Sequence, residues 1–304
     1  MKVIISGGYG YIGTNLVKHF LTHGITPTIL ARSERDYFKE CAYIKVDITE
    51  DLTHIPSVEA NVFIHLAAAN DVDSKNTLSA IKGTTLGTKH ALEYCIKNKI
   101  AHFIYFSTFQ IYGAVDKDFT NETIPEPNND YGITHLFAEE YVKMFARNHG
   151  LTYTILRPTN IFGSPLNKQI NRWSLVPGCF CKEALEKGTI TLLSSGKQVR
   201  DFLNLNDISR FTVDLCSSKE QHQNQEIILH SGNQYSILEI AQLTKAIYEA
   251  KFKKSCQLKV LSSQPEESNY FSIEDKNLKQ MNFSFQNKDS IREEIEKTFE
   301  VLLQ

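Results

Sequence analysis

Hydrophobic residues along the chain follow two alternating patterns. Short runs of consecutive apolar, often β-branched residues are typical of buried strands. These runs are residues 3–6, 26–30, 42–46, 62–68, 102–108 and 152–156. Between them lie stretches in which apolar residues recur every three or four positions, as in an amphipathic helix. Among these stretches are residues 11–23, 77–98 and 131–148. This alternation predicts consecutive βαβ units.

The predicted strands are apolar on both faces. The runs VFIHLAA at 62–68 and HFIYFS at 102–107 lack the polar alternation of a strand with one solvent-exposed face. Parallel strands that helices cover on both sides have this composition. We therefore predict an α/β protein with a Rossmann-type, doubly wound parallel sheet.

The pattern changes after Gly163 to a mixture of helices and strands with polar connections. This part predicts a smaller, mixed α/β substrate-binding cap over the carboxyl ends of the strands. We assign residues 1–163 and 203–232 to a dinucleotide-binding Rossmann domain, and residues 164–202 and 233–304 to the cap. Ser-x-x-Glu sequences at 236–239 and 290–293 predict capping boxes at the start of two cap helices.

The composition argues against several classes of protein. The 304 residues contain 33 Lys and Arg against 35 Asp and Glu, so there is no basic excess to bind a nucleic acid backbone. No run approaches the roughly 18 apolar residues of a membrane span, and the first residues lead into glycines without the apolar core of a signal peptide. The six cysteines are scattered, and their one close pair, Cys179 and Cys181, fits neither a zinc site nor a disulfide framework. We expect a soluble, cytoplasmic protein with no metal, nucleic acid or membrane partner.

A glycine-rich loop follows the first predicted strand. The sequence SGGYGYIG at 6–13 puts Gly7, Gly10 and Gly13 between this strand and the helix that starts at Tyr11. Backbone amides and the helix dipole at such a junction hold a pyrophosphate, and glycine lets the chain approach it closely. A glycine pattern alone also occurs at ordinary tight turns, but its position between a strand and a helix favours a dinucleotide site.

The residues after the second strand bear on the choice of dinucleotide. Proteins that prefer NAD(H) carry a carboxylate there for the ribose 2′-hydroxyl, whereas this chain has Ala31, Arg32 and Ser33. An arginine pairs with a 2′-phosphate, so we predict NADP(H) in preference to NAD(H), with a solvated surface arginine as the alternative. After the third strand, Asp47 either accepts a hydrogen bond from the adenine amino group or caps the next turn. His65 lies in an apolar strand and is expected to be a core histidine without a chemical role.

Six motifs occur in order along most of the chain. They are SGGYGYIG at 6–13, HLAA at 65–68, STFQIYG at 107–113, YGITHLFAEEYV at 131–142, LRPTNIFG at 156–163 and RDF at 200–202. Together they resemble the extended short-chain dehydrogenase/reductase family of nucleotide-sugar epimerases, dehydratases and 4-ketoreductases. The resemblance implies a nucleoside diphosphate sugar as substrate and a homodimer built on residues 77–98 and 131–148. It also implies that the dinucleotide contacts further residues besides the glycines, namely Tyr11, Ile12, Ile48, Leu66, Ala67 and Ala68.

The family's catalytic pattern is a Ser or Thr after the fifth strand and a Tyr-x-x-x-Lys on the next helix. Thr108 and Tyr131 match this pattern. By resemblance, Thr108 hydrogen-bonds the sugar, and Tyr131 exchanges the proton that accompanies hydride transfer at the nicotinamide. His135 stands where the lysine is expected. It shares a helix face with Tyr131, but at an ordinary pKa of about 6.5 it is mostly uncharged near pH 7.

The absence of lysine favours one direction of reaction. A nearby ammonium group lowers the pKa of tyrosine and favours phenolate, the form that an alcohol oxidation requires. Ketone reduction needs a protonated phenol instead, so the exchange to His135 harms a reductase less. The sugar 4,6-dehydratases carry adjacent Asp and Glu after the catalytic Thr, and Phe109 and Gln110 stand here. Since neither is a general acid or base, dehydratase activity is disfavoured.

The substrate side of the motifs contains polar candidates. Asn160 matches the family residue that faces the nucleotide sugar, and an asparagine after Pro is also a common turn former. Arg200 matches the arginine that reaches the substrate diphosphate, and Asp201 is a candidate to orient it. Arg172 and Trp173 are further candidates for the sugar or base. The segment QPEESNY at 264–270 lacks the family's Arg-Pro-x-Asp form, which leaves the sugar and base open.

These residues together predict an NADPH-dependent reductase of a nucleotide-linked 4-keto-6-deoxy sugar. A nucleotide-sugar epimerase of the same family is the alternative. Because His135 breaks the catalytic pair, a dinucleotide-sensing or scaffolding protein without activity is a third hypothesis.

Overall fold

A parallel sheet forms the centre of the molecule. The computed structural model describes residues 1–114, 117–217, 223–261, 270–286 and 289–304. Seven strands lie in the order β11-β7-β5-β4-β1-β2-β3, and all neighbours are parallel. Their bounds are β1 (Val3–Ser6), β2 (Thr28–Ala31), β3 (Tyr43–Lys45), β4 (Val62–His65), β5 (His102–Phe106), β7 (Thr152–Pro158) and β11 (Gln225–Leu229). The predicted doubly wound sheet is confirmed.

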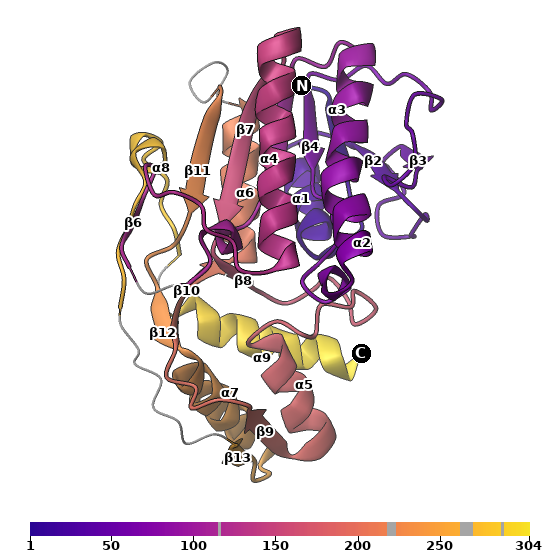
Figure 1. Ribbon diagram of the computed structural model, residues 1–304. Helices are drawn as coiled ribbons and strands as arrows, with labels where there is room; N and C mark the ends of the chain where they lie inside the picture. The colour runs from indigo at the N-terminus through magenta and orange to yellow at the C-terminus, as the bar shows by residue number, and fades with distance from the viewer. Residues whose placement is uncertain (115–116, 218–222, 262–269, 287–288) are drawn as a thin grey trace.

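The pleat of the strands divides the apolar residues between two cores. Val3 and Ile5 pack on one side of β1, and Ile4 packs on the other. Helices α1 (Tyr11–Thr22) and α6 (Leu205–Ser217) cover the first side. Helices α3 (Gly87–Lys97) and α4 (Asp130–His149) cover the second (Figure 1). This double covering explains why the strands are apolar throughout.

The helix boundaries follow local signals. α1 is followed by Gly24, which adopts a positive φ of 70° as expected of a terminating glycine. The predicted helical stretch at 77–98 consists of α2 (Thr77–Ala80), a π-helical segment η2 (Ile81–Leu86) and α3. α4 is capped at its start by Asn129, whose side chain accepts a hydrogen bond from the Gly132 amide.

Further helices pack below the sheet in Figure 1 around an apolar core of their own. They are α5 (Gly178–Lys187), α7 (Ile237–Phe252) and α9 (Ser290–Leu303), together with the parallel pair β9 (Thr189–Leu192) and β13 (Gln257–Val260). Three strands, β8 (Asn160–Phe162), β10 (Val199–Asn204) and β12 (Gln234–Ser236), form another sheet. Two short helices, η1 (Asp73–Lys75) and η3 (Phe109–Tyr112), and the parallel pair β6 (Phe119–Thr120) and β14 (Ile273–Glu274) lie outside these groups.

Helix α8 (Lys276–Gln280) belongs to the cap by sequence position but packs against the sheet. Its Leu278 lies in the core that α1 and α6 cover. The polypeptide therefore returns from the cap to the central sheet before α9 begins. The domain boundaries drawn from the sequence stay a prediction.

The two predicted capping boxes differ in outcome. Ser236 and Glu239 form the reciprocal hydrogen bonds of a capping box at the start of α7. The prediction for Ser290 and Glu293 is wrong, since Ser290 is already the first residue of α9 and Asp289 is the N-cap. The physical reason is that Asp289 already has helical backbone angles (φ −68°, ψ −22°), so Ser290 lies inside the helix, whereas a cap at Ser290 would need an extended conformation there.

The structure also bears on the predictions about cysteines, membrane spans and metal sites. All six cysteines are free thiols. Among the described residues, no helix is long and apolar enough to cross a membrane, and no three His, Cys, Asp or Glu side chains gather in a way that would hold a metal ion.

Candidate active site

A cavity of about 700 Å³ lies at the carboxyl ends of β1, β4 and β5. Residues of the cap line its opposite side. It brings together most of the residues predicted for cofactor, catalysis and substrate. These are Gly7, Gly10, Tyr11, Ile12, Gly13, Leu66, Ala68, Thr108, Tyr131, His135, Asn160 and Arg200. Two predicted cofactor residues, Arg32 and Asp47, line a second cavity of about 450 Å³.

Two other predicted cofactor residues, Ile48 and Ala67, are absent from the lining of both cavities. The backbone amide of Ala67 closes against Gly7, where a Cβ atom would come within 3.0 Å of it. Ile48 packs on Gly87 at the start of α3. Both residues therefore support the walls of the site.

The glycine loop is built so that its backbone can approach a ligand. Gly7 has a φ of +74°, in the region that favours glycine. A Cβ atom at Gly13 would lie 2.2 Å from the carbonyl oxygen of Gly7, so only glycine fits against this turn. The close packing brings the start of α1 directly beneath the loop.

The N-terminus of α1 fits a pyrophosphate. Its N-cap is Gly10, no side chain caps the first amides, and the first turn carries no acidic residue. Backbone donors at the positive end of the helix dipole are therefore available to an anion. Tyr11 fixes this turn to the far side of the cavity, because its hydroxyl donates to the carbonyl oxygen of Gly163 over 2.7 Å.

The second cavity holds charged groups of both signs. Arg32 is exposed at the end of β2, and Asp47 lies after β3. Hydrogen bonds from the amide and hydroxyl of Thr49 lower the pKa of Asp47, and the charge of Arg32 contributes to the same shift. Asp47 therefore caps the following turn as a carboxylate, one of the two roles expected for it.

The catalytic pair predicted from the sequence is assembled in the larger cavity. Thr108 is buried after β5 and caps helix η3, where its Oγ1 accepts a hydrogen bond from the amide of Gln110. Thr108 and Tyr131 line the same cavity. Burial raises the pKa of Tyr131, and first Arg172 and then Thr108 act against this shift. The tyrosine is a protonated phenol at neutral pH.

His135 lies one turn further along α4, with its ring 4.7 Å from that of Tyr131. Burial lowers the pKa of His135 to about 3, so its imidazole is neutral. Its Nδ1 is hydrogen-bonded to the hydroxyl of Tyr105 at 2.7 Å, and its Nε2 is buried without a hydrogen-bond partner among the described residues. An unpartnered nitrogen at this place fits a ligand hydroxyl group.

His65 is buried, as expected, and its Nδ1 is hydrogen-bonded to Ser6 at 2.7 Å. Its ring stacks on Tyr105, which in turn stacks on His135. Burial lowers the pKa of His65 to about 3, and His135 contributes to the same shift.

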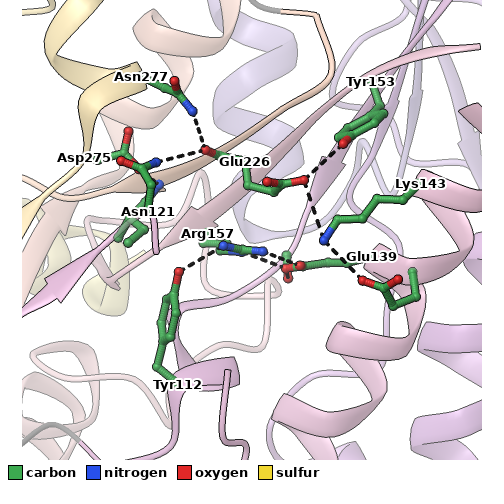
Figure 2. Close-up of polar contacts among 12 residues, drawn as sticks. Tyr112, Asn121, Glu139, Lys143, Tyr153, Arg157, Glu226, Asp275 and Asn277 are labelled. Atoms are coloured by element: carbon green, nitrogen blue, oxygen red, sulfur yellow. Dashed lines mark hydrogen bonds and ion pairs between the residues drawn. The ribbon is translucent and has the colours of Figure 1, made fainter. Parts of the chain in front are cut away.

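A buried ion pair lies behind the residues predicted to be catalytic. Two nitrogens of Arg157 on β7 donate to the two carboxylate oxygens of Glu139 on α4, over 3.0 and 2.6 Å (Figure 2). Arg157 also donates to the hydroxyl of Tyr112 over 2.9 Å. Ser107, which precedes Thr108, donates to Glu139 over 2.6 Å. The pair thus ties the catalytic helix to the strands that end at the cavity.

Asn160 and Arg200, the predicted substrate-binding residues, line the larger cavity, whereas the role predicted for Asp201 is not found. Asn160 donates to the backbone oxygen of Asp201 over 3.2 Å, and Arg200 donates to the backbone oxygen of Val199 over 2.8 Å. The proposal that Asp201 orients Arg200 is wrong. Asp201 is buried and binds Thr159 and Ser231, because neighbouring residues of β10 point to opposite faces of the strand.

Arg172 lies in the cap segment before α5 and forms an ion pair of 2.7 Å with Asp71. The neighbouring Trp173 donates to the backbone oxygen of Lys168 and is absent from the lining of the larger cavity. In the segment at 264–270, residues 264–269 lie outside the described residues.

Comparison with known proteins assigns the fold and site to a family. The model of the NAD dependent epimerase/dehydratase family matches residues 3–229. The chain belongs to this family. Its members are enzymes that act on nucleotide sugars, and the family resemblance inferred from the motifs is confirmed.

Relatives within the family differ in activity. The chain is 30% identical over 253 residues to GDP-6-deoxy-D-talose 4-dehydrogenase of Aggregatibacter actinomycetemcomitans, which covers 80% of this chain and 79% of that protein. It is 27% identical to dTDP-D-glucose 4,6-dehydratase of Dictyostelium discoideum, over 68% of this chain and 53% of that protein. The UDP-glucuronic acid 4-epimerase of Bacillus cereus, solved with UDP-glucuronic acid and NAD, superposes with a TM-score of 0.82 at 23% identity, covering 100% of this chain and 99% of that one.

Some residues that the structure places in or behind the candidate site were not found from the sequence. Glu139 follows Tyr131 by eight positions, so helical spacing alone puts it on the same face as His135. Tyr105 carries a hydroxyl inside an otherwise apolar strand, which signals that a buried partner is needed. No pattern signals Asp71, whose partner Arg172 is 101 residues away.

Proposed function

We propose that the protein reduces the keto group of a nucleotide-linked 4-keto-6-deoxy sugar to a hydroxyl group, with NADPH as hydride donor. The observation that carries this proposal is the packing of Tyr131 against His135 in the cavity, with their rings 4.7 Å apart and no lysine in the place of His135. Burial raises the pKa of Tyr131 and lowers that of His135, so a protonated phenol lies beside a neutral imidazole. A protonated phenol is the form that donates to a ketone oxygen.

NADPH, when bound, supplies the hydride that is added to carbon 4 of the sugar. We propose that Thr108 hydrogen-bonds the keto oxygen and that Tyr131 gives this oxygen its phenolic proton. The product alcohol then has a new C–H bond at carbon 4, formed with the hydride, and a new O–H bond, formed with the proton. Tyr131 recovers a proton from solvent. His135 orients the nicotinamide ribose through its unpartnered Nε2. Asn160 and Arg200 bind the nucleoside diphosphate.

The preference for NADPH is supported by the end of β2. Arg32 is exposed beside the second cavity, and Lys45 from the end of β3 lines the same cavity. A 2′-phosphate would meet two cations there. No acidic side chain stands at 31–33 to bind a 2′-hydroxyl.

Two other activities of the family fit this site less well. An epimerase begins by oxidising an alcohol and needs a phenolate, which the raised pKa of Tyr131 disfavours. A dehydratase needs a general acid and base beside the sugar. Phe109 is buried with its ring 4.7 Å from that of Phe119, and Gln110 does not ionise.

The proposal also covers the division of the chain into domains and its oligomeric state. We propose that residues 1–163 and 203–232 bind the dinucleotide, and that residues 164–202 and 233–304 bind the nucleotide sugar. We also propose a cytoplasmic homodimer. Helices α2, η2 and α4 contact one another, and their side chains Leu78, Ile81 and Phe137 expose apolar surface that a second copy could cover. The mass in solution tests the dimer.

Deuterium transfer tests the reaction class. The protein is incubated with NADPH deuterated at the transferring position and with 4-keto-6-deoxy sugars linked to UDP, dTDP, GDP or CDP. We expect NADPH to be consumed with one of them and the label to appear on carbon 4 of the product by mass spectrometry and NMR. Conversion of a nucleotide sugar to its 4-epimer without net consumption of NADPH would show an epimerase and overturn the proposal.

A further inference from the structure

Charge is sparse around the catalytic tyrosine. Among the described residues that line the larger cavity, the permanently charged side chains are Asp71, Arg172 and Arg200. Asp71 follows β4 on the dinucleotide side, and Arg172 comes from the cap. Their ion pair of 2.7 Å therefore crosses the cavity.

This ion pair is partly shielded from water. The Arg172 side chain is 22% exposed and that of Asp71 is 35% exposed. Charges in such a position are screened less than charges on an open surface, so their effect on a neighbour is larger. Arg172 also lies beside Tyr11, with which it lines a smaller adjoining cavity.

Tyr131 lines the same cavity as this ion pair, and His135, the residue one turn further along α4, is neutral. After burial, the positive charge of Arg172 is the largest influence on the pKa of Tyr131, and it lowers this pKa. The negative charge of Asp71 has the opposite effect.

We propose that the Arg172–Asp71 ion pair takes the electrostatic role of the absent lysine: Arg172 stabilises the phenolate that Tyr131 becomes on giving up its proton, and Asp71 limits this stabilisation. The inference rests on the proposed function in that it takes Tyr131 as the proton donor. Arg172 and Asp71 are positioning residues in this scheme, since they act through Tyr131.

The other ionisable groups around Tyr131 do not supply this charge. Burial keeps Tyr105 on β5 protonated, with a pKa well above its ordinary value, and it keeps Tyr11 on α1 protonated in the same way. The negative charge of Glu139 on α4 is balanced by Arg157, which donates two hydrogen bonds to its carboxylate. The titratable and charged residues that line the cavity with Tyr131 are Tyr11, Asp71, His135, Arg172 and Arg200, and Tyr105 interacts with Tyr131 from β5.

Direct titration of the phenol tests the proposal without any substrate. Tyrosine labelled with ¹³C at Cζ is incorporated into the full chain, and the resonance of Tyr131 is assigned by its absence in Tyr131→Phe. The midpoint of its ionisation is compared between variants over the pH range in which circular dichroism shows a retained fold. We expect Arg172→Met to raise the midpoint by about one unit and Asp71→Asn to lower it by a similar amount.

The opposite signs separate an electrostatic role from a structural one. If the pair only holds the cap to the sheet, loss of either partner loosens the same contact and both midpoints move in the same direction, which overturns the proposal. Arg172→Lys keeps the charge and should stay near the wild type, and Arg200→Met removes a charge from the same cavity and should leave the midpoint unchanged. An equal rise in Arg200→Met would contradict a specific role of Arg172.

A rescue variant gives a second decision. In Arg172→Met, the further substitution His135→Lys restores a cation beside the phenol and should return the midpoint to the wild-type value or below it. Failure of this rescue in a folded protein would contradict the proposal. Because none of these readouts requires turnover, failure of the proposed reduction and failure of this inference are distinguishable.

Discussion

At position 135, an imidazole lies against the phenol of Tyr131, and both rings are uncharged at neutral pH because they are buried. The residue type was visible in the sequence, but its charge was not. An ordinary histidine with a pKa of about 6.5 would be partly protonated near neutral pH. Burial behind Tyr105 removes this possibility, and the hydrogen bond to Tyr105 leaves only Nε2 to face a ligand.

The predicted preference for NADPH depends on a single residue, Arg32. Replacing Arg32 by Ala should raise the dissociation constant of NADPH about tenfold or more, because a charge-assisted hydrogen bond to phosphate contributes about 1.5–3 kcal/mol. The affinity for NADH should not change. Arg35→Ala, which removes an exposed arginine from the same loop, is the matched control. Fluorescence titration measures the affinities of the three proteins for both cofactors, and equal binding of NADPH and NADH by the wild type would contradict the assignment.

Helix α4 is the element that organises the site. Tyr131, His135 and Glu139 follow one another at intervals of four residues, so they lie along one face. The first two face the cavity. The third is held by Ser107, which follows β5, and by Arg157 on β7; Figure 2 shows the pair with Arg157. Periodicity predicted this helix to within two residues at either end. It did not predict the ion pair beneath it, because a strand arginine gives no signal of its partner.

The energetic weight of this anchor is testable. Glu139→Gln leaves the buried Arg157 without its carboxylate and should lower the free energy of unfolding by about 3 kcal/mol. Lys143→Gln, on the same helix, breaks more exposed ion pairs with Glu140 and Glu226 and should cost about 1 kcal/mol or less. Urea unfolding of both variants gives the comparison. Similar losses in the two would mean that the buried pair is not the anchor.

At the scale of the whole molecule, the cap segment after β8 closes over the dinucleotide side through contacts between distant residues. Tyr11 binds Gly163, Tyr37 donates to Gln169, and Arg172 binds Asp71. The order of strands and the glycine loop were predictable because they follow from local periodicity and turn chemistry. The closure of the cap was not, since it depends on pairs more than 100 residues apart. The capping box at Ser290 was wrong because the helix begins one residue earlier than the Ser-x-x-Glu pattern predicts, with Asp289 as its N-cap.

The central claim is that the reaction takes its proton from a neutral Tyr131, and the pH profile of NADPH oxidation with a 4-keto-6-deoxy nucleotide sugar tests it most directly. The account predicts a kcat/KM that is constant across neutral pH and falls only above the ordinary tyrosine pKa of about 10, because burial raises the pKa of the phenol that must stay protonated. Tyr131→Phe should lower the rate by about a hundredfold or more. Full activity in Tyr131→Phe, or a decline of the wild-type rate as the pH rises through about 6.5, where an unperturbed histidine loses its proton, would contradict the account.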